Sequence, residues 1–495
     1  GYDADNDGTF TMAEKPAWLT ALSSESGSGG TSAEAGTATL TKDVKDLLKE
    51  RNDRLKNATA VGSASAPYDL SLHNYQGATT ARNTANSYLI SAPGHYRIPL
   101  VYGNAIKNGA TNSNAYETTA TGTYVLQHFK DHNNQNITDP WIEKSNAANA
   151  GIDGAKIVWA DEKDLVTSPS IAHDASGDAY LDFEVKQADI KSGNAVVAVT
   201  KGGTVVWSWH LWFAPKDALD KIEVTNHQGV KYNFTKEALG WKLIQWSGST
   251  YSSARTVKVK VEQTVANNGT KQEAVINITQ NPGSVKKGAT TLYQFGRKDA
   301  FPGVDETQLP QGSINKNAGD NMSITNGIQH PDFYYTGGSN WNSNYGYYNL
   351  WSADNTVTGD WNVGNDNLVV KTVYDPSPVG FKMPANNAFT GFTANGQNDG
   401  TMNVDGTDDR QTFSNNFGHN FWTSSSKKAT INFPASGFRF SNGGALNDVG
   451  NSGYYWLAVP NGLNNGCDLL FHSFNVRPLS NDARAFGFSV RPVSE

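Results

Sequence analysis

Cysteine is almost absent from this chain, with one residue of this type, Cys467, among 495. An intrachain disulfide is therefore excluded, and stability must come from packing or from bound metal. The sequence also contains no run of about 18 apolar residues, so it predicts no membrane-spanning helix. Clusters of Lys and Arg are missing, and the formal net charge is -7. Because phosphate binding needs concentrated basic residues, nucleic acid is not expected as a partner.

Charged residues are scarce at 18%, whereas aromatics reach 11% and Gly occurs 48 times. Together with abundant Asn, Thr and Ser, this composition is typical of short strands joined by long polar loops, and it predicts a mainly β protein. A chain of 495 residues is expected to form roughly two to four domains. The chain begins with Gly rather than Met and shows no charged-then-apolar leader, which we interpret as the processed form of an exported protein.

Alternating apolar residues predict strands from about residue 68 to residue 215. The clearest are Ala179–Val185 and a hairpin of Asn194–Thr200 and Thr204–Phe213, which are joined by a Lys-Gly-Gly turn. An aromatic stripe in the last strand can bind sugar, but burial inside a β-sandwich is favoured because so apolar a face is costly in water. The stripe consists of Val205, Trp207, Trp209, Leu211 and Phe213.

Other regular patterns lie in the first 56 residues and in residues 216–286. Arg255–Glu262 and Glu273–Thr279 alternate, and they predict a small Ig-like region or the remaining strands of the preceding sandwich. Residues 23–37 are rich in Ser and Gly and predict a flexible linker, and a helix is expected over Thr41–Lys56. The chain is thus expected to divide into residues 1–40, 41–215, 216–286 and 287–495.

The sharpest motif lies in residues 3–14, which follow the pattern D-x-D-x-D-G-x5-E of EF-hand-type calcium loops. Ca²⁺ takes six to eight oxygen ligands, and Gly8 permits the sharp bend that brings them together. A helix is expected over Pro16–Ser23. Because two residues precede the loop, its entering helix is missing, and the alternative is a loop without an ion; a bound ion would anchor the terminus. The candidate ligands are Asp3, Asp5, Asp7, Thr9, Thr11 and Glu14.

Four sequence blocks in the last third of the chain carry a family resemblance. They are Tyr374–Pro384, Phe433–Arg439, Gly453–Trp456 and Arg484–Val493. In order and composition they resemble the Fibrobacter succinogenes major paralogous domain family of bacterial surface proteins. The resemblance implies an α+β, C-type-lectin-like domain over residues 287–495.

A second resemblance covers the preceding region. Arg82–Tyr88, Tyr96–Asn104, Trp207–Trp212 and Tyr293–Asp299 resemble fimbrillin-like surface proteins of Bacteroidales, which are similar to tip or accessory subunits of type V pili. This implies an Ig- or transthyretin-like β-sandwich pilin domain and export to the cell surface as a fimbrial protein. It also implies assembly with other pilin subunits by donor-strand exchange, in which a foreign strand completes a sheet.

The lectin-like resemblance does not imply calcium-mediated sugar binding, because the Glu-Pro-Asn and Trp-Asn-Asp motifs of calcium-dependent lectins are missing. A surface for a host or bacterial glycan, or for a protein, could instead use exposed Asn, His and Trp side chains, since Trp stacks on sugar rings. The alternative is that Trp456 belongs to the core and the Asn-rich segment is a turn. The candidate residues are Trp456, Asn461, Asn464, Asn465, His472 and Asn475.

Enzymatic activity is not predicted. The lectin-like fold also supports oxidases of the formylglycine-generating type, but these need reactive cysteines, and Cys467 is expected to be a buried, inert thiol. Hydrolase, zincin and Walker signatures are missing. Arg439 and Arg491 are expected to make ion pairs or hydrogen bonds to carbonyls. Two alternatives to a pilus adhesin stay open: a free-standing surface lipoprotein that captures glycans, and a carbohydrate-active enzyme, whose carboxylate pair a sequence does not reveal.

Overall fold

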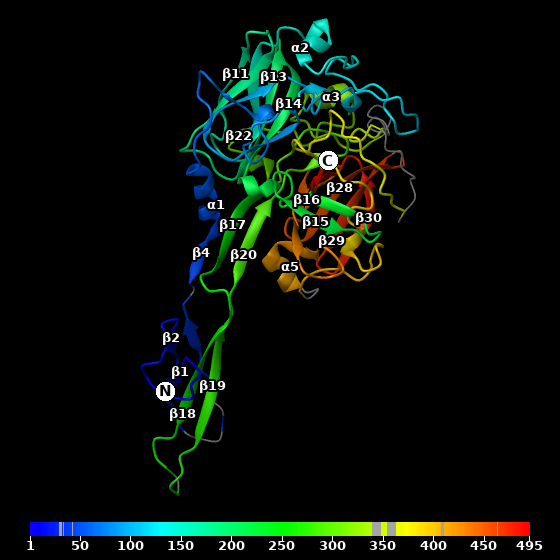
Figure 1. The fold of residues 1–495 in the computed structure, drawn as a ribbon. Helices are drawn as coiled ribbons and strands as arrows, with labels where there is room; N and C mark the ends of the chain where they lie inside the picture. The colour runs from blue at the N-terminus through cyan, green and yellow to red at the C-terminus, as the bar shows by residue number, and fades with distance from the viewer. Residues whose placement is uncertain are drawn as a thin grey trace. The chain divides into compact units, whose positions relative to one another are not determined.

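The computed structural model describes residues 1–28, 32, 34–41, 43–266, 268–338, 348–353, 363–406, 410–462 and 464–495 (Figure 1). In the described structure strands account for 39% and helices for 10%, which confirms the expected mainly β class. No helix in the described ranges is both long and apolar enough to cross a membrane. Residues 29–31 and 33 of the expected linker lie outside the described residues.

The chain forms two compact units, each built from two separate stretches of sequence. The small unit comprises residues 1–48 and 245–285, and the large unit comprises residues 49–244 and 286–495. This division differs from the four expected segments. Residues 216–286 form no unit of their own, because part of them pairs with the N-terminus and part with the C-terminus. A pattern that is followed along the sequence does not reveal such long-range pairing.

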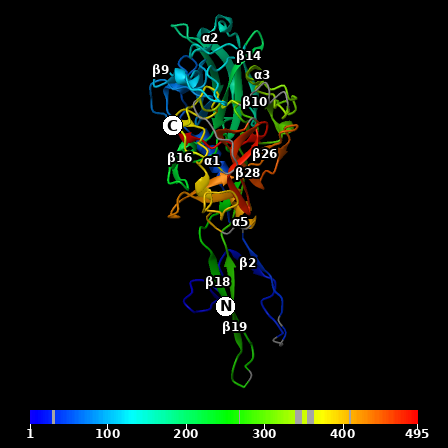
Figure 2. The same cartoon turned by 90° about the vertical axis from the view of Figure 1, so that its right-hand side faces the viewer.

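The small unit is built on the hairpin of β18 (Arg255–Glu262) and β19 (Glu273–Gln280), which run side by side in Figure 1 and Figure 2. β1 (Tyr2–Asp3) pairs antiparallel with β18 and completes a three-stranded sheet. The buried hydrophobic residues of this unit that pack together are Tyr2, Leu19 and Val257.

Two expected helices of the N-terminal region are replaced wholly or partly by strands. The helix expected over Pro16–Ser23 is instead β2 (Leu19–Leu22), which pairs with β3 (Ala38–Leu40) and buries Leu19 in the core. The helix expected from residue 41 begins six residues later, as α1 (Leu47–Lys56), because β4 (Val44–Asp46) pairs with β17 (Lys242–Ser249). Pairing with distant strands thus overrides the local helical pattern.

The large unit contains two sheets that share one hydrophobic core. The predicted hairpin is confirmed as β13 and β14, and every side chain of the predicted aromatic stripe is buried. The core therefore explains this stripe, and sugar binding does not. The five-stranded sheet has the order β22 (Gln311–Gly312), β10 (Gly154–Ala160), β13 (Gly193–Lys201), β14 (Thr204–Phe213) and β6 (Ser87–Ile90). The four-stranded sheet has the order β11 (Thr167–His173), β12 (Ala179–Val185), β7 (Gly94–Pro99) and β5 (Tyr68–Asp69).

Smaller sheets and short helices complete the large unit. One sheet has the order β15 (Lys221–Thr225), β16 (Lys231–Thr235), β32 (Val493–Ser494) and β23 (Phe381–Lys382). Another has the order β21 (Tyr293–Gln294), β31 (Gly487–Phe488), β26 (Phe438–Arg439) and β27 (Leu446–Asn447). A third has the order β28 (Ser452–Asn461), β29 (Asn465–His472) and β30 (Asn475–Ala483). The two-stranded sheets are β24 (Gly418–Trp422) with β25 (Thr430–Pro434), and β8 (Ile106–Lys107) with β9 (Ala110–Thr111).

The remaining described elements are brief. The α-helices are α2 (Ile142–Ser145), α3 (Ile324–Gln329) and α5 (Arg410–Asn416). The 3-10 turns are η1 (Leu70–Leu72), η2 (Ser113–Ala115), η3 (Ala147–Asn149), η4 (Lys216–Leu219), η5 (Glu306–Gln308) and η6 (Thr390–Phe392). β20 (Ser284–Ala289) pairs with β17 in a three-stranded sheet of the order β20, β17 and β4.

Candidate metal centre and ligand surfaces

Two backbone hydrogen bonds close residues 3–10 of this motif into a loop. Tyr2 N donates to Thr11 O at 2.8 Å, and Thr11 N donates to Tyr2 O at 2.9 Å. Gly8 bends the loop with a φ of 88°, in the left-handed region that favours glycine, and its N–H donates to Asp3 Oδ2 at 3.2 Å. Because Tyr2 and Asp3 also pair with β18, the loop is fixed to the sheet of the small unit.

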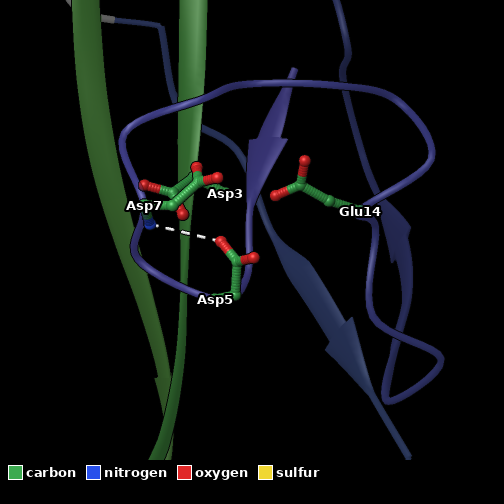
Figure 3. Close-up of side chains that lie close together, drawn as sticks. All are labelled: Asp3, Asp5, Asp7 and Glu14. Atoms are coloured by element: carbon green, nitrogen blue, oxygen red, sulfur yellow. Dashed lines mark hydrogen bonds between the residues drawn. The ribbon is translucent and has the colours of Figure 1, made fainter.

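Four carboxylates of this loop meet at one place. One ligand oxygen from each of Asp3, Asp5, Asp7 and Glu14 lies within 4.8 Å of the others, and Figure 3 shows their carboxylates around a common space. Asp3 is buried, and its Oδ1 has no hydrogen-bond partner. Lys258 on β18 forms an ion pair with this side chain, with its Nζ 3.6 Å from Asp3 Oδ2. Carboxylates gathered so closely repel one another, so the arrangement favours a bound divalent cation.

Hydrogen bonds from neighbouring loop residues hold these carboxylates in place. Asp7 N donates to Asp5 Oδ1 at 3.2 Å, and Thr9 N donates to Asp7 Oδ1 at 2.7 Å. Thr11 Oγ1 donates to Glu14 Oε1 at 2.9 Å. The structure therefore gives Thr11 a positioning contact to a predicted ligand, in addition to its expected role beside a bound water.

Trp456 does not lie on a surface, which corrects the expectation that its ring could stack on a ligand. Its side chain is fully buried at 0% exposure, and Nε1 donates to Tyr293 O at 2.7 Å. The ring packs against Phe295 and Phe488, with centroid distances of 5.4 and 4.3 Å. Its position agrees with the alternative interpretation, in which Trp456 belongs to the core.

The five other candidate residues fall into two groups at opposite ends of β29. Asn461 and Asn465 face each other where β28 meets β29, with Asn464 exposed in the turn between them. His472 and Asn475 face each other where β29 meets β30. At about 3.3 Å per residue the two ends of this eight-residue strand are more than 20 Å apart. One small ligand therefore does not touch both groups.

A cleft of about 380 Å³ opens beside His472. Phe474, in the turn between β29 and β30, is 66% exposed, and its ring lies parallel to that of His472 at 5.9 Å. Arg410, at the start of α5, contributes a cation to the lining. Neither Phe474 nor Arg410 was predicted from the sequence. Phe474 could have been noticed, because an apolar side chain in a two-residue turn between strands is unusual. The lining residues are Arg410, Phe413, Ser414, Gly450, Asn451, His472, Ser473 and Phe474.

No family model, curated protein or solved structure matches the chain. The roles of its sites therefore follow from contacts within the chain itself. The two family resemblances remain predictions.

A second cavity of the large unit, of about 310 Å³, is lined by residues on and around β5 and β6. These are the last strands of the four-stranded and the five-stranded sheet. Its walls are rich in aromatic and aliphatic side chains, and the rings of Tyr68 and His73 stack at 3.8 Å. Lys216 lies at its margin and donates to Gln76 O at 2.9 Å. The lining includes Val61, Tyr68, Leu70, His73, Tyr88, Leu89, Tyr96 and Leu219.

The structural roles expected for Arg439, Arg491 and Cys467 are confirmed. Arg439 is fully buried and donates to the carbonyls of residues 302, 304 and 444 and to Glu306. Arg491 donates to the carbonyls of residues 235, 236 and 432. Cys467 is buried, and desolvation raises the pKa of its thiol to about 12, which makes it a poor nucleophile.

Two carboxyl groups on neighbouring strands contrast with these satisfied charges. Asp468 on β29 is fully buried, and both of its carboxyl oxygens have no hydrogen-bond partner. Desolvation, and then the charge of Asp482 on β30, raises the pKa of Asp468 well above its usual range. Desolvation also raises the pKa of Asp482, to about 6, against the opposing effect of Arg477. Sequence patterns gave no sign of this pair, because residues 14 apart come together only through strand pairing.

Proposed function

We propose that the chain is an extracellular adhesin that binds Ca²⁺ through residues 3–14 and joins a pilus by accepting a strand from a neighbouring subunit. The observation that carries the calcium part is the meeting of four loop carboxylates within 4.8 Å. The pilus part is supported by the sequence resemblance and by a groove in the large unit. The ligand part is supported by the cleft beside His472.

The oxygen ligands suit a hard cation of the size of Ca²⁺. Three Asp carboxylates, a bidentate Glu14, the Thr9 carbonyl and one water would provide six to eight oxygens. The buried and unpartnered Oδ1 of Asp3 would gain a partner, which removes the cost of an unsatisfied buried acceptor. Since Asp3 belongs to β1, the ion would also fix the N-terminal segment to β18. This is a structural role, in which the ion performs no chemistry.

Isothermal titration calorimetry of Ca²⁺ against the intact chain tests the loop. We expect one site, and we expect Asp3→Asn and Glu14→Gln each to weaken it at least tenfold because each removes a charged ligand. Glu25→Gln is the matched control, since Glu25 is a nearby carboxylate that pairs with Lys15 at 3.4 Å outside the loop. Equal heats from the wild type and the Asp3 and Glu14 variants would exclude the calcium site.

The cavity beside β5 and β6 is the place where we propose that a foreign strand binds. It lies at the last strands of two sheets that share a core, and its lining is largely apolar. Strand addition at such a position gains main-chain hydrogen bonds and buries alternate side chains in the groove. Leu89, which is half-buried on β6, contributes to the lining.

Binding of a synthetic C-terminal strand from a candidate pilin, followed by fluorescence anisotropy, tests this part. We expect Leu89→Arg to abolish binding, because a charge in the groove opposes an apolar side chain. Ile171→Arg is the matched control, since Ile171 is half-buried on β11, at the other edge of the same four-stranded sheet as β5. Binding that both variants reduce equally, or no binding by the wild type, would count against the pilus proposal. A free-standing surface protein that captures glycans would then be favoured.

The cleft beside His472 is the proposed contact for a surface ligand. Phe474 offers an exposed ring for stacking on a sugar or on an apolar side chain, and Asn451 and His472 offer hydrogen-bonding groups. A glycan array with the intact chain, compared with Phe474→Ala, tests the ligand class. Loss of glycan signal in the variant supports a lectin; a silent array together with binding to a protein partner would remove the sugar ligand.

A further inference from the structure

One edge of the three-stranded sheet in the small unit is formed by β19, a long strand without features that block further pairing. β19 pairs with β18 at eight consecutive positions without a bulge, and in the described part of the chain it has no strand on its other side. Apolar side chains of β19 are exposed on both faces, with Val275 50% exposed and Ile276 54% exposed. A long, regular and apolar edge of this kind is a template for pairing with another strand.

Other long edge strands of the chain carry features that oppose such pairing. β11 contains Pro169 and has a bulge between residues 167 and 170. β30 contains Pro478, and its pairing with β29 has a register shift. Proline lacks an N–H, and bulges twist an edge away from a flat partner. β19 has neither feature, so its edge differs from edges that are protected in the same protein.

The backbone groups that β19 presents to a partner follow from the pairing of β18. Lys260 exchanges two hydrogen bonds with Gly1, because Lys260 N donates to Gly1 O and Gly1 N donates to Lys260 O. The backbone of Lys260 therefore points away from β19. Val275 is its partner on β19, and the groups of such an antiparallel pair point away from each other. The N–H and C=O groups of Val275, and of Asn277 two residues later, thus face the free edge.

We propose that β19 pairs antiparallel with β19 of a second copy of the chain, about a twofold axis at Ile276. In this register Ile276 faces its own copy, and Val275 faces Asn277. Ala274 then faces Ile278, and Glu273 faces Thr279, so no like charges oppose each other. The segment is thus complementary to itself, which is what an isologous interface requires.

This pairing also extends the apolar face of the hairpin. Side chains of Val257, Val259, Ile276 and Ile278 alternate on one face of β18 and β19, and pairing of two copies would make that face continuous. A groove of about 470 Å³ opens over part of it, lined by Tyr2, Met12, Val259, Ile276 and Ile278 among others. A partner strand beside β19 would cover the exposed side of Ile276, where the groove meets the edge.

Sedimentation analysis of the intact chain with Ca²⁺, over a range of concentrations, tests the association. We expect the mass to double with concentration, and we expect Ile276→Glu to weaken association at least tenfold because two carboxylates would face each other at the axis. Ile276→Thr keeps a β-branched side chain without charge and should still associate. A monomeric wild type at every concentration would overturn the proposal, and so would unchanged association of Ile276→Glu. Because Ile276 is 54% exposed, neither change threatens the fold.

Engineered cysteines test the register independently. At a non-hydrogen-bonded pair the Cα atoms lie about 4.5 Å apart, which permits a disulfide. Ile276→Cys should therefore form a covalent dimer on oxidation, visible without reducing agent on a denaturing gel. Thr279→Cys is the matched control, because in this register its own copy lies six residues, or about 20 Å, away along the strand. The natural Cys467 is buried and does not interfere. Equal cross-linking of both variants would overturn the register.

Discussion

The two units of this protein differ in how their charged side chains are satisfied by neighbouring groups. The large unit buries Arg439 and Arg491 completely and satisfies each guanidinium with several hydrogen bonds to carbonyls. The small unit gathers four carboxylates and places one cation, Lys258, 3.6 Å from the buried Asp3. A large core can hold fully bonded charges, whereas a small one needs another source of stability. Because disulfides are excluded, the proposed Ca²⁺ ion would be such a source for the small unit.

The largest expected effect concerns the packing of the large unit. Trp456→Ala should lower the free energy of unfolding by about 3–5 kcal/mol, because it removes a fully buried ring and the hydrogen bond to Tyr293 O. Urea unfolding followed by circular dichroism measures this change. Asn464→Ala, in the turn between β28 and β29, is the control, and its effect should stay within about 0.5 kcal/mol because Asn464 is exposed. A stable Trp456→Ala variant with lost ligand binding would restore a ligand role for Trp456.

The sequence predicted those features of the large unit that depend on neighbouring residues. The stripe from Val205 to Phe213 alternates over a single strand, so its period and its turn could both be recognised. Pairing between distant segments could not be recognised in this way. Val44–Asp46 looks helical in isolation and becomes a strand because Ser247–Ser249 lies beside it. The meeting of four loop carboxylates could be predicted because all of them fall within twelve residues of sequence, whereas the cleft beside His472 joins α5 to a distant turn.

Calcium should stabilise the small unit and leave the stability of the large unit unchanged, because the proposed ligands all belong to the small unit. At a Ca²⁺ concentration of 100 times Kd, the ion should add about 2.7 kcal/mol to the stability of the structure that binds it. Hydrogen exchange of peptides from residues 1–22 and 255–280 should slow correspondingly, and EDTA should reverse the effect. Peptides from β13 and β14 are the internal control. Slower exchange in both units, or in neither, would contradict this division.

The pair of Asp468 and Asp482 is the exception within the large unit, and it should make that unit sensitive to pH. The folded-state pKa of Asp482, about 6, lies above the value of about 3.9 expected in an unfolded chain. The folded state therefore binds this proton more tightly, and the resulting stability is present below pH 4 and is lost as the pH rises through about 6. Asp482→Asn should stabilise the large unit by about 1–3 kcal/mol at pH 7.5 and have little effect at pH 4.

The difference between variant and wild type at each pH is the quantity to measure, by urea unfolding. The wild type must be subtracted because His210 also makes the stability of the large unit depend on pH. Desolvation lowers the pKa of its buried imidazole to about 3. Its contribution to stability is present above the unfolded value of about 6.5 and is lost as the pH falls, which opposes the effect of Asp482. A difference that does not vary between pH 4 and 7.5 would show that Asp482 titrates normally. Asp482 would then no longer be an exception among the charged groups of the large unit.

The smallest expected effect tests whether the ammonium group of Lys258 competes with the proposed Ca²⁺ ion for Asp3. Lys258→Met should raise the affinity for Ca²⁺ about two- to fivefold, because a partly exposed ammonium 3.6 Å from Asp3 Oδ2 competes with the ion by up to about 1 kcal/mol. Calorimetry measures the change, and Lys260→Met is the matched control, since Lys260 on the same strand pairs with Glu273. A weaker site in Lys258→Met would mean that the lysine orders Asp3 for the ion instead of competing with it. The small unit would then hold Asp3 with a partner from its own chain, as the large unit holds Arg439 and Arg491, and the two units would differ mainly in the number of partners that each buried charge has.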